Sequence, residues 1–516
     1  MARLDRLPPL PPPPHAPLRQ HGHFPPHGSS RKWGARADAV RHAFLHAYAG
    51  YQEYAGQNDE LKPLSEGAVN NFNGWKLTLV DGLDTMWIMG LHDEFYDAVT
   101  KIAELDFNLE EGSFAPFFET VIRYLGGMLS AYALSGEPVL LGRADELGSM
   151  LLPAMKTDSG LPMYAVNTKT GETRQGWTRG TVLWAEALSC QLEYKYLAHL
   201  TGRQNTSSAY ARMLYCHYVI TQREQVEHIM DLMNSANVTD GMFPTKWDLI
   251  NGIPTNTQFS VGAFADSAHE YLLKQWLLTS KSEPKARDLY VRASTSIIEN
   301  LLSSRPILTP RVRDIHAWAA QGLAYTCWMT YADQDAGLGP DEMRMDHLPK
   351  SEEDPYGGLW LYQVDKWEEA GRPGGVPPGL KEGPRMPAGK RDYRAQKAGY
   401  FLRPETVESF YLLWRTTGDE VWRERGWAVF QAIERETKTK SGYASLQSVE
   451  KSPRPRRMRC PAVSAQFFLA ETLKYLYLLF TDEELIPLDQ WVFNTEAHPL
   501  PVFQWTDWEK KAYGLN

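Results

Sequence analysis

The stretch FFETVIRYLGGMLSAYALSG (117–136) shows the design that decides the fold. An acidic residue, Glu119, stands where the first turn of a helix would lie, apolar residues follow at helical spacing, and a small residue and a glycine end the segment. Its apolar residues cover most of the helix circumference, and helices of this kind are buried inside proteins. The stretch therefore predicts an inner helix that begins with a carboxylate.

The same design recurs along the chain. Two plain copies are WAEALSCQLEYKYLAHLTG (184–202) and RPETVESFYLLWRTTGD (403–419), and three looser ones are LTLVDGLDTMWIMGL (77–91), GAFADSAHEYLLKQWL (262–277) and AQFFLAETLKYLYLLF (465–480). More amphipathic segments lie between them, such as DEVWRERGWAVFQAIERE (419–436), whose charged side should face water. The alternation predicts an all-α ring of helical hairpins with six inner helices.

This geometry brings acidic residues together. If all inner helices run in one direction, their first turns meet at one rim of the ring, and Glu119, Glu186, Glu405 and Glu471 converge there. A single glutamate in a first turn is typical of a helix cap. Four that face one hollow are typical of a site that hydrolyses a glycosidic bond or holds a hard metal ion.

Two cations accompany these acids. Arg123 follows Glu119 by four residues, on the same helix face, and Arg403 precedes Glu405 by two residues across Pro404. Each guanidinium can favour the ionised form of its neighbour or bind a sugar hydroxyl. Ordinary ion pairing within a helix is the alternative interpretation.

The composition excludes several classes of protein. The 516 residues carry a formal net charge of −9, and their Lys and Arg residues are dispersed, so no nucleic-acid-binding surface is predicted. No run of eighteen apolar residues exists, so no transmembrane helix is expected. Four cysteines (Cys190, Cys216, Cys327 and Cys460) are too few and too scattered for a disulfide scaffold or a zinc site.

The N-terminal stretch differs from the rest. Residues 1–35 are rich in Pro and His (PPLPPPPHAP, HGHFPPHGSS) and do not resemble a signal peptide. Such a composition cannot form a core. We expect a disordered leader over 1–35 and one catalytic domain over 36–516.

The recurring segments resemble class I α-1,2-mannosidases, glycoside hydrolase family 47, from about Arg36 to Pro501. The motifs that carry the resemblance are LTLVDGLDTMWIMGL, FFETVIRYLGGMLSAY, WAEALSCQLEY, ADSAHEYLLKQWL, LRPETVES, FFLAETLKYLYLLF and VFNTEAHPLP, in the family's order. The resemblance implies an (α/α)7 toroid that removes terminal α-1,2-linked mannose from high-mannose N-glycans with inversion. It also implies one bound Ca2+, a monomer, and a place in the endoplasmic reticulum or Golgi.

The resemblance further assigns residues. Thr495 matches the one residue that binds Ca2+ directly, Glu405 matches the general base, and Glu119 matches a candidate general acid. The remaining matches shape the sugar pocket or hold calcium-bound waters, and they are Arg123, Glu186, Arg403, Glu408, Phe467, Glu471 and Glu496.

One family segment has no counterpart in this chain. Members carry an acidic residue followed by His-Leu-x-Cys-Phe and a Gly-rich turn before the helix that here reads WAAQGLAYTCWMTYA (318–332), whereas this chain runs into that helix directly through residues 305–316. The resemblance thus implies that one inner helix of seven is missing and that Cys327 lacks its disulfide partner. Residues 350–399, rich in Gly, Pro and charge, are predicted to be loop.

Three functions follow as hypotheses. The first is the mannosidase itself, and the second is a calcium-dependent mannose-binding protein with impaired catalysis, since an acidic segment is absent. The third, from the ring alone, is another toroidal glycosidase or a cyclase, for which removal of calcium would have no effect.

Overall fold

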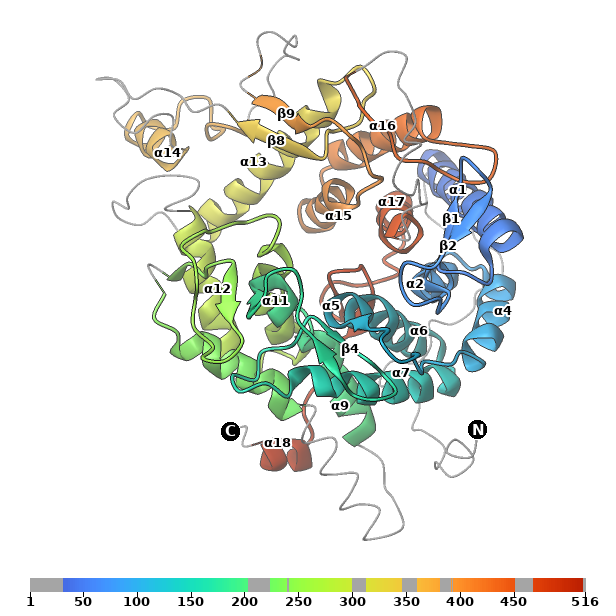
Figure 1. The fold of residues 1–516 in the computed structure, drawn as a ribbon. Coiled ribbons are helices and arrows are strands. Elements are labelled where there is room, and N and C mark those ends of the chain that lie inside the picture. The colour runs from blue at the N-terminus through green and yellow to red at the C-terminus, as the bar shows by residue number, and fades with distance from the viewer. Residues whose placement is uncertain are drawn as a thin grey trace.

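The fold is a ring of helices, with an inner layer surrounded by an outer one, seen in a computed structural model (Figure 1). The structure describes residues 31–202, 223–238, 241–298, 312–345, 360–380, 391, 393–450 and 467–513. Of the predicted leader over 1–35, residues 31–35 are helical and Trp33 is buried in the core, so the boundary at residue 35 is wrong. The rest of the leader lies outside the described residues, as do Cys216 and Cys460. No helix in the described ranges is long and apolar enough to cross a lipid bilayer.

All six predicted inner helices form, several of them in short consecutive pieces. They are α2 (Leu77–Asp81) with α3 (Leu83–Ile88); α5 (Phe117–Glu119), η2 (Thr120–Leu125) and α6 (Gly126–Ser135); α8 (Trp184–Leu188) with α9 (Gln191–Gly202); α11 (Asp266–Leu278); α15 (Glu405–Thr417); and η7 (Phe468–Thr472) with α17 (Leu473–Phe480). Most of these pieces are buried on nearly every side, as their apolar circumference predicts.

A second layer surrounds them. Its helices are α1 (Arg31–Ala55), α4 (His92–Ala103), α7 (Pro138–Leu151), α12 (Pro284–Ser296), α13 (Val312–Ala332) and α16 (Val421–Glu436), with α14 (Trp360–Glu369) and α18 (Asp507–Tyr513) at the periphery. The amphipathic helix α16 buries one side and exposes its charged side, as predicted. The hairpin partners α6 and α7, α11 and α12, and α15 and α16 pack on each other.

Short antiparallel sheets occupy the connections between helices. They pair β1 (Glu60–Lys62) with β2 (Gly67–Val69), β4 (Ala165–Val166) with β3 (Ala115–Pro116) and β5 (Thr173–Arg174), β6 (Thr181–Leu183) with β7 (Lys246–Asp248), β8 (Glu342–Met345) with β9 (Tyr393–Lys397), and β10 (Trp491–Phe493) with β11 (Pro499–Pro501). Two of these strands, β3 and β6, lead directly into the first turn of an inner helix, α5 and α8, so they fix where that turn lies.

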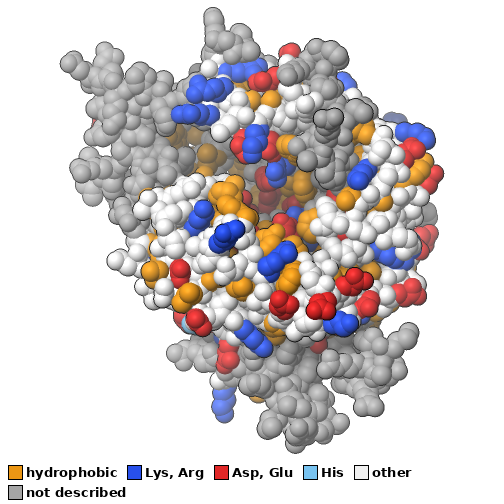
Figure 2. All heavy atoms as spheres, viewed as in Figure 1, with side chains coloured by type: hydrophobic (Ala, Val, Ile, Leu, Met, Phe, Trp, Pro, Cys, Tyr) orange, Lys and Arg blue, Asp and Glu red, His pale blue; other side chains and the backbone are white. Residues whose placement is uncertain are grey.

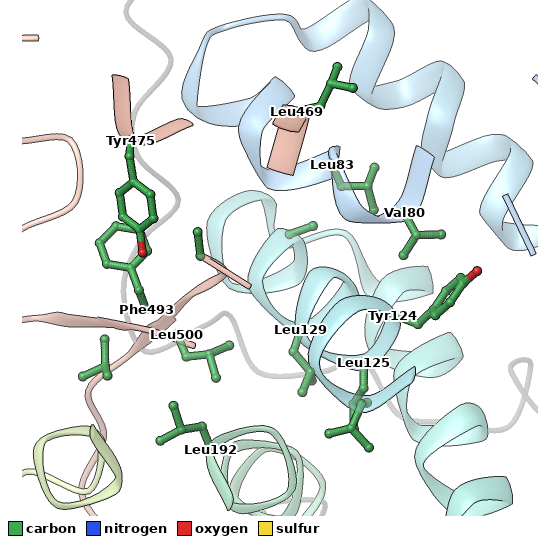
Figure 3. Packing of buried hydrophobic residues seen from close by; sticks show 14 of the residues in the cluster. Val80, Leu83, Tyr124, Leu125, Leu129, Leu192, Leu469, Tyr475, Phe493 and Leu500 are labelled. Atoms are coloured by element: carbon green, nitrogen blue, oxygen red, sulfur yellow. The ribbon is translucent and has the colours of Figure 1, made fainter. Parts of the chain in front are cut away.

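The ring closes between the two ends of the chain. Helix α1 packs against α17, and η7 packs against α2 and α3. Figure 3 shows the core that results, where Val80, Leu83, Tyr124, Leu125 and Leu129 converge with residues from the last hundred positions of the chain. Closure buries apolar surface from distant parts of the sequence in one core.

Helix α13 runs outside both α11 and α15 and packs on α15 (Figure 1). The predicted loss of one inner helix concerns this part of the ring. It stays a prediction, because residues 299–311 lie outside the described part of the chain.

The prediction that residues 350–399 form only loop is wrong. Helix α14 and strand β9 both lie in this range. Leu361, Val364 and Trp367 recur every three residues on α14 and are buried, so a short amphipathic pattern was present among the Gly and Pro residues. Strand β9 forms because β8 supplies its partner, which is a long-range cause.

Candidate active site

A tight turn between β10 and β11 carries Thr495 and Glu496 into the middle of the ring. The Asn494 side-chain oxygen accepts hydrogen bonds from the backbone N–H groups of Glu496 (2.9 Å) and His498 (2.8 Å), and Ala497 takes a left-handed conformation (φ 58°). The Asn494 amide donates to the carbonyl of Ile122 at 2.9 Å. These bonds fix the turn against η2 and leave Thr495 half-buried.

Glycine makes this approach possible. A Cβ atom on Gly126 would stand 2.6 Å from the Asn494 amide nitrogen, closer than real side chains come. The LGG triplet in the first quoted motif thus has a packing reason, since only glycine admits the turn so close to the helix.

Arg123 links three acids from different segments. Its Nε donates to Glu119 at 2.7 Å, one Nη binds the Glu496 carboxylate, and the same nitrogen lies 3.8 Å from Asp81. Arg123 therefore forms the ion pair within the helix that its spacing from Glu119 allows, and its contact with a sugar hydroxyl stays a prediction. Arg123 lies in the π-helical segment η2, and Glu471 lies in another, η7. Such insertions in α-helices recur at functional sites.

Beneath the turn lies a fully buried layer of charge. The His498 ring is bonded to Asp84 (2.8 Å) and Asp81 (3.1 Å), and Lys474 pairs with Asp84 (2.8 Å) and donates to the Ala497 carbonyl (2.6 Å). Burial alone would lower the pKa of His498, but the two aspartates raise it. Burial would raise the pKa of Asp84, but Lys474 and His498 lower it to about 2.

The carboxyl groups of Glu471 and Glu496 are buried and crowded. Burial raises the pKa of Glu471 well above its ordinary value, and Glu496 and Glu405 raise it further. Burial also raises the pKa of Glu496, and Arg123 only partly opposes this. A cation beside these two groups would stabilise both as carboxylates.

This donor set fits calcium bound mainly through water and substrate. In the described ranges, no three His, Cys, Asp or Glu side chains stand close enough together to hold a metal ion. Thr495, the half-buried residue of an otherwise buried turn, offers a hydroxyl and a carbonyl beside Glu496, and Ca2+ accepts waters and neutral oxygens as ligands. The residues present therefore suit an ion that keeps much of its coordination shell for other molecules.

Glu405 begins α15, which packs on η7, the segment that carries Glu471. Its side chain is 64% exposed, and the guanidinium of Arg403 lies 3.8 Å away while donating to Asp341 at 2.7 Å. Desolvation by the surrounding protein raises the pKa of Glu405, and repulsion by Asp266 and Glu270 adds to this. The positive charge of Arg403 lowers it. Solvent therefore reaches a carboxyl that is surrounded by protein charge.

Two further predicted residues have pKa values near neutrality. Burial raises the pKa of Glu186 to about 7, and Glu119 contributes by repulsion. Burial likewise raises the pKa of Glu408 to about 7, although Lys274 opposes this, and Tyr475 donates to Glu408 at 3.1 Å. Shifts of this kind are common in catalytic pockets.

The structure brings the predicted acids together. Electrostatic contacts connect Glu119 with Glu186 and Glu496, and connect Glu471 with Glu405 and Glu408. Phe467 directly precedes η7 and is half-buried against the core. Figure 2 shows the face of the ring hollowed at its centre, with acidic side chains visible inside.

Sequence reasoning missed several residues of this site. Asp266 opens α11, where burial and Glu270 raise its pKa and Arg403 lowers it. Its signal was present, because it occupies the same first-turn position as Glu119, Glu186 and Glu405. Asp81, Asp84 and His498 were also missed, and their pairing required the tertiary structure.

Comparisons with known proteins agree with this geometry. The model of glycosyl hydrolase family 47 matches residues 43–311 and 307–502. The two parts meet where the sequence places the missing segment. Mannosyl-oligosaccharide alpha-1,2-mannosidase IA of Drosophila melanogaster is 34% identical over an alignment of 496 positions that covers 90% of this chain and 67% of the relative.

Two further relatives cover most of the chain. The human endoplasmic reticulum mannosyl-oligosaccharide 1,2-alpha-mannosidase is 34% identical over 98% of this chain and 68% of its own length. The solved α-1,2-mannosidase from Trichoderma reesei superposes with a TM-score of 0.71 at 25% identity, covering 91% of this chain and 99% of that one. The predicted all-α toroid of the (α/α)7 type is thereby confirmed. The chain belongs to glycosyl hydrolase family 47.

Proposed function

We propose that this chain is an exo-acting mannosyl-oligosaccharide 1,2-α-mannosidase that removes terminal α-1,2-linked mannose from high-mannose N-glycans with inversion. The observation that carries the proposal is the convergence of Glu119, Glu186, Glu405 and Glu471 on one hollow beside Thr495. The names of the relatives support the substrate, and those that include the endoplasmic reticulum support a place in the secretory pathway.

In this proposal Glu405 is the general base. A base must be ionised to take a proton from the attacking water, and Arg403 favours that form. The exposure of Glu405 gives water access to it. Inversion needs room for this water between the base and the acid.

Two carboxyls compete for the role of general acid. Glu119 accepts a hydrogen bond from Arg123 at 2.7 Å, and the resemblance implies that it would deliver a proton through a bound water. Asp266 has a raised pKa and stands among Glu270, Arg403 and Glu405, so it retains a proton to higher pH than an ordinary aspartate. Glu119 and Asp266 are therefore both candidates for the general acid, and the resemblance assigns the role to Glu119.

The pocket residues have supporting roles. Arg123, Arg403, Glu186 and Glu408 offer hydrogen bonds to sugar hydroxyls, and Phe467 offers an aromatic ring. Glu471 and Glu496 would hold waters around an ion at Thr495. When bound there, Ca2+ would complete its coordination with vicinal hydroxyls of the terminal mannose.

Release of mannose from a high-mannose oligosaccharide tests the proposal. We expect turnover by the purified protein, loss of turnover in EDTA with recovery on adding Ca2+, and a loss of at least about a hundredfold in Glu405→Gln. Retained, calcium-dependent glycan binding without turnover would instead favour the mannose-binding alternative. Turnover that EDTA does not affect would favour another type of toroidal glycosidase.

A substrate with a good leaving group separates the two acid candidates. Departure of an aryl group of low pKa needs no protonation, so a variant that lacks only the acid should keep its turnover of an aryl mannoside. We expect one of the two variants, Glu119→Gln or Asp266→Asn, to lose cleavage of the oligosaccharide and to keep turnover of the aryl mannoside. If neither variant retains aryl mannoside turnover, neither residue acts only as the acid.

A further inference from the structure

An exposed aromatic pair stands outside the acidic cluster. The Trp177 side chain is 65% exposed, more than any other large apolar residue in the described ranges, and its ring lies 5.9 Å from that of Phe264 at an angle of 49°. Phe264 itself is 36% exposed and has a φ of 79°. That backbone conformation is costly for a bulky residue, and such strain is concentrated at functional sites.

The backbone connects this pair to the acids. The Ala185 N–H, next to Glu186, donates to the Phe264 carbonyl at 3.0 Å, and Phe264 lies two residues before Asp266. The loop that carries Trp177 leads into β6 and from there into α8 with Glu186. Three extended residues span about 10 Å, so β6 sets the Trp177 loop about that far from the first turn of α8 and outside the acidic cluster.

The Trp177 ring is held in place before any ligand arrives. Lys246 Nζ lies 5.3 Å from the ring centroid, and β7, which carries Lys246, pairs with β6. Thr178 and Thr181 bond reciprocally to each other's carbonyls at 2.7 and 3.1 Å, which closes the loop. An aromatic ring fixed in this way binds with little loss of side-chain freedom.

We propose that Trp177, supported by Phe264, is a subsite for a sugar ring that lies beyond the two mannoses of the cleaved bond. The inference rests on the proposed function. With the terminal mannose among the carboxyls, the rest of the oligosaccharide must leave past the rim. A pyranose has an apolar C–H face that packs flat on an exposed indole, while its hydroxyls stay in water.

Continuity with the acidic cluster favours this occupant. The pair shares its backbone with the helices that begin at Glu186 and Asp266, so a ligand held there extends from the pocket. Apolar peptide of a glycoprotein and a second copy of the chain are the other occupants that an aromatic surface could take, and each predicts a different result.

Two substrates test the subsite with Trp177→Ala. For a peptide-free high-mannose oligosaccharide we expect KM to rise about tenfold, the loss of one aromatic anchor, with kcat unchanged. For an α-1,2-linked mannose disaccharide, which is too short to reach the rim, KM and kcat should change less than about twofold. Trp177→Phe should recover part of the affinity, and Trp508→Ala, an exposed tryptophan on α18, is the matched control.

The outcomes separate this inference from the proposed function. Equal effects on both substrates, or on neither, would overturn the subsite. An effect only on an intact glycoprotein would assign the surface to peptide. A concentration-dependent change of mass in the wild type that Trp177→Ala abolishes would assign the surface to self-association. Either result would overturn the sugar subsite. If the wild type binds oligosaccharide without cleaving it, the proposed function fails, and the same comparison by calorimetric titration still decides the subsite.

Discussion

At the scale of single residues, Arg403 illustrates how one charge adjusts a catalytic candidate. Desolvation by the surrounding protein raises the pKa of Glu405, and the positive charge of Arg403 lowers it. Removal of the guanidinium should therefore raise the pKa of Glu405 further. Because a general base works only when ionised, the acid limb of the kcat/KM profile in Arg403→Gln should move to higher pH.

Arg403→Lys is the control for this prediction. It keeps a positive charge, so its acid limb should lie between those of the wild type and Arg403→Gln. The profile of kcat/KM against pH is the measurement, since it reports groups of the free enzyme. An acid limb that stays in place in Arg403→Gln would remove Glu405 from the role of base.

Thr495 carries a second prediction at this scale. If its hydroxyl and carbonyl bind Ca2+, the metal stabilises only the folded chain, by about 2.7 kcal/mol at a hundredfold excess over Kd. Thr495→Ala should lose most of the rise in melting temperature on adding calcium. Thr416→Ala, an exposed threonine on α15, should keep it. An undiminished rise in Thr495→Ala would refute the assignment.

At the scale of elements, the β10–β11 turn depends on the buried charges beneath it. His498 stands between Asp81 and Asp84, and its replacement leaves two buried carboxylates without their shared cation. We expect His498→Gln to lose about 3–5 kcal/mol of unfolding free energy. Replacement of the exposed His42 by Gln should have little effect.

The pH dependence of this loss has a defined sign. The folded-state pKa of His498 is raised, so its contribution is complete below its ordinary value of 6.5 and is lost as pH rises through the folded value. The pKa of Asp84 is lowered from 3.8 to about 2, so its contribution is lost only as pH falls through that value. The difference between wild type and variant in urea denaturation should be greatest between pH 3.8 and 6.5. A difference that grows above neutral pH would contradict this account.

At the scale of the whole molecule, α1 and α17 join the ends of the chain. Trp33 stacks on Phe480 with ring centroids 6.1 Å apart, and the Arg423 guanidinium lies 4.0 Å from the Trp33 ring. Because ring closure buries Trp33, we expect Trp33→Ala to lower the free energy of unfolding by about 3–5 kcal/mol. This loss is expected although Trp33 lies outside the acidic cluster. Unfolding followed by circular dichroism and by fluorescence should stay one coincident transition at lower temperature. A separate early transition would show that α1 is an appendage.

The sequence by itself determined the six inner helices, because each carries apolar residues at helical spacing and four of them end at or beside a glycine. It also predicted that Glu119, Glu186, Glu405 and Glu471 converge, since first turns of parallel inner helices meet at one rim. Asp266 occupied the same position and could have been found by the same rule. These features are local patterns repeated along the chain.

Only the tertiary structure decided which charges meet. The pairing of Arg123 with Glu496, and of His498 with Asp81 and Asp84, joins residues about 400 positions apart, and no local pattern encodes it. Strand β9 was misjudged for the same reason, because it exists only where β8 supplies its hydrogen bonds. Helix α14, by contrast, had a local amphipathic pattern that was overlooked. Helical periodicity is written in neighbouring residues, whereas the pKa of a carboxyl depends on every charge that folding brings near it.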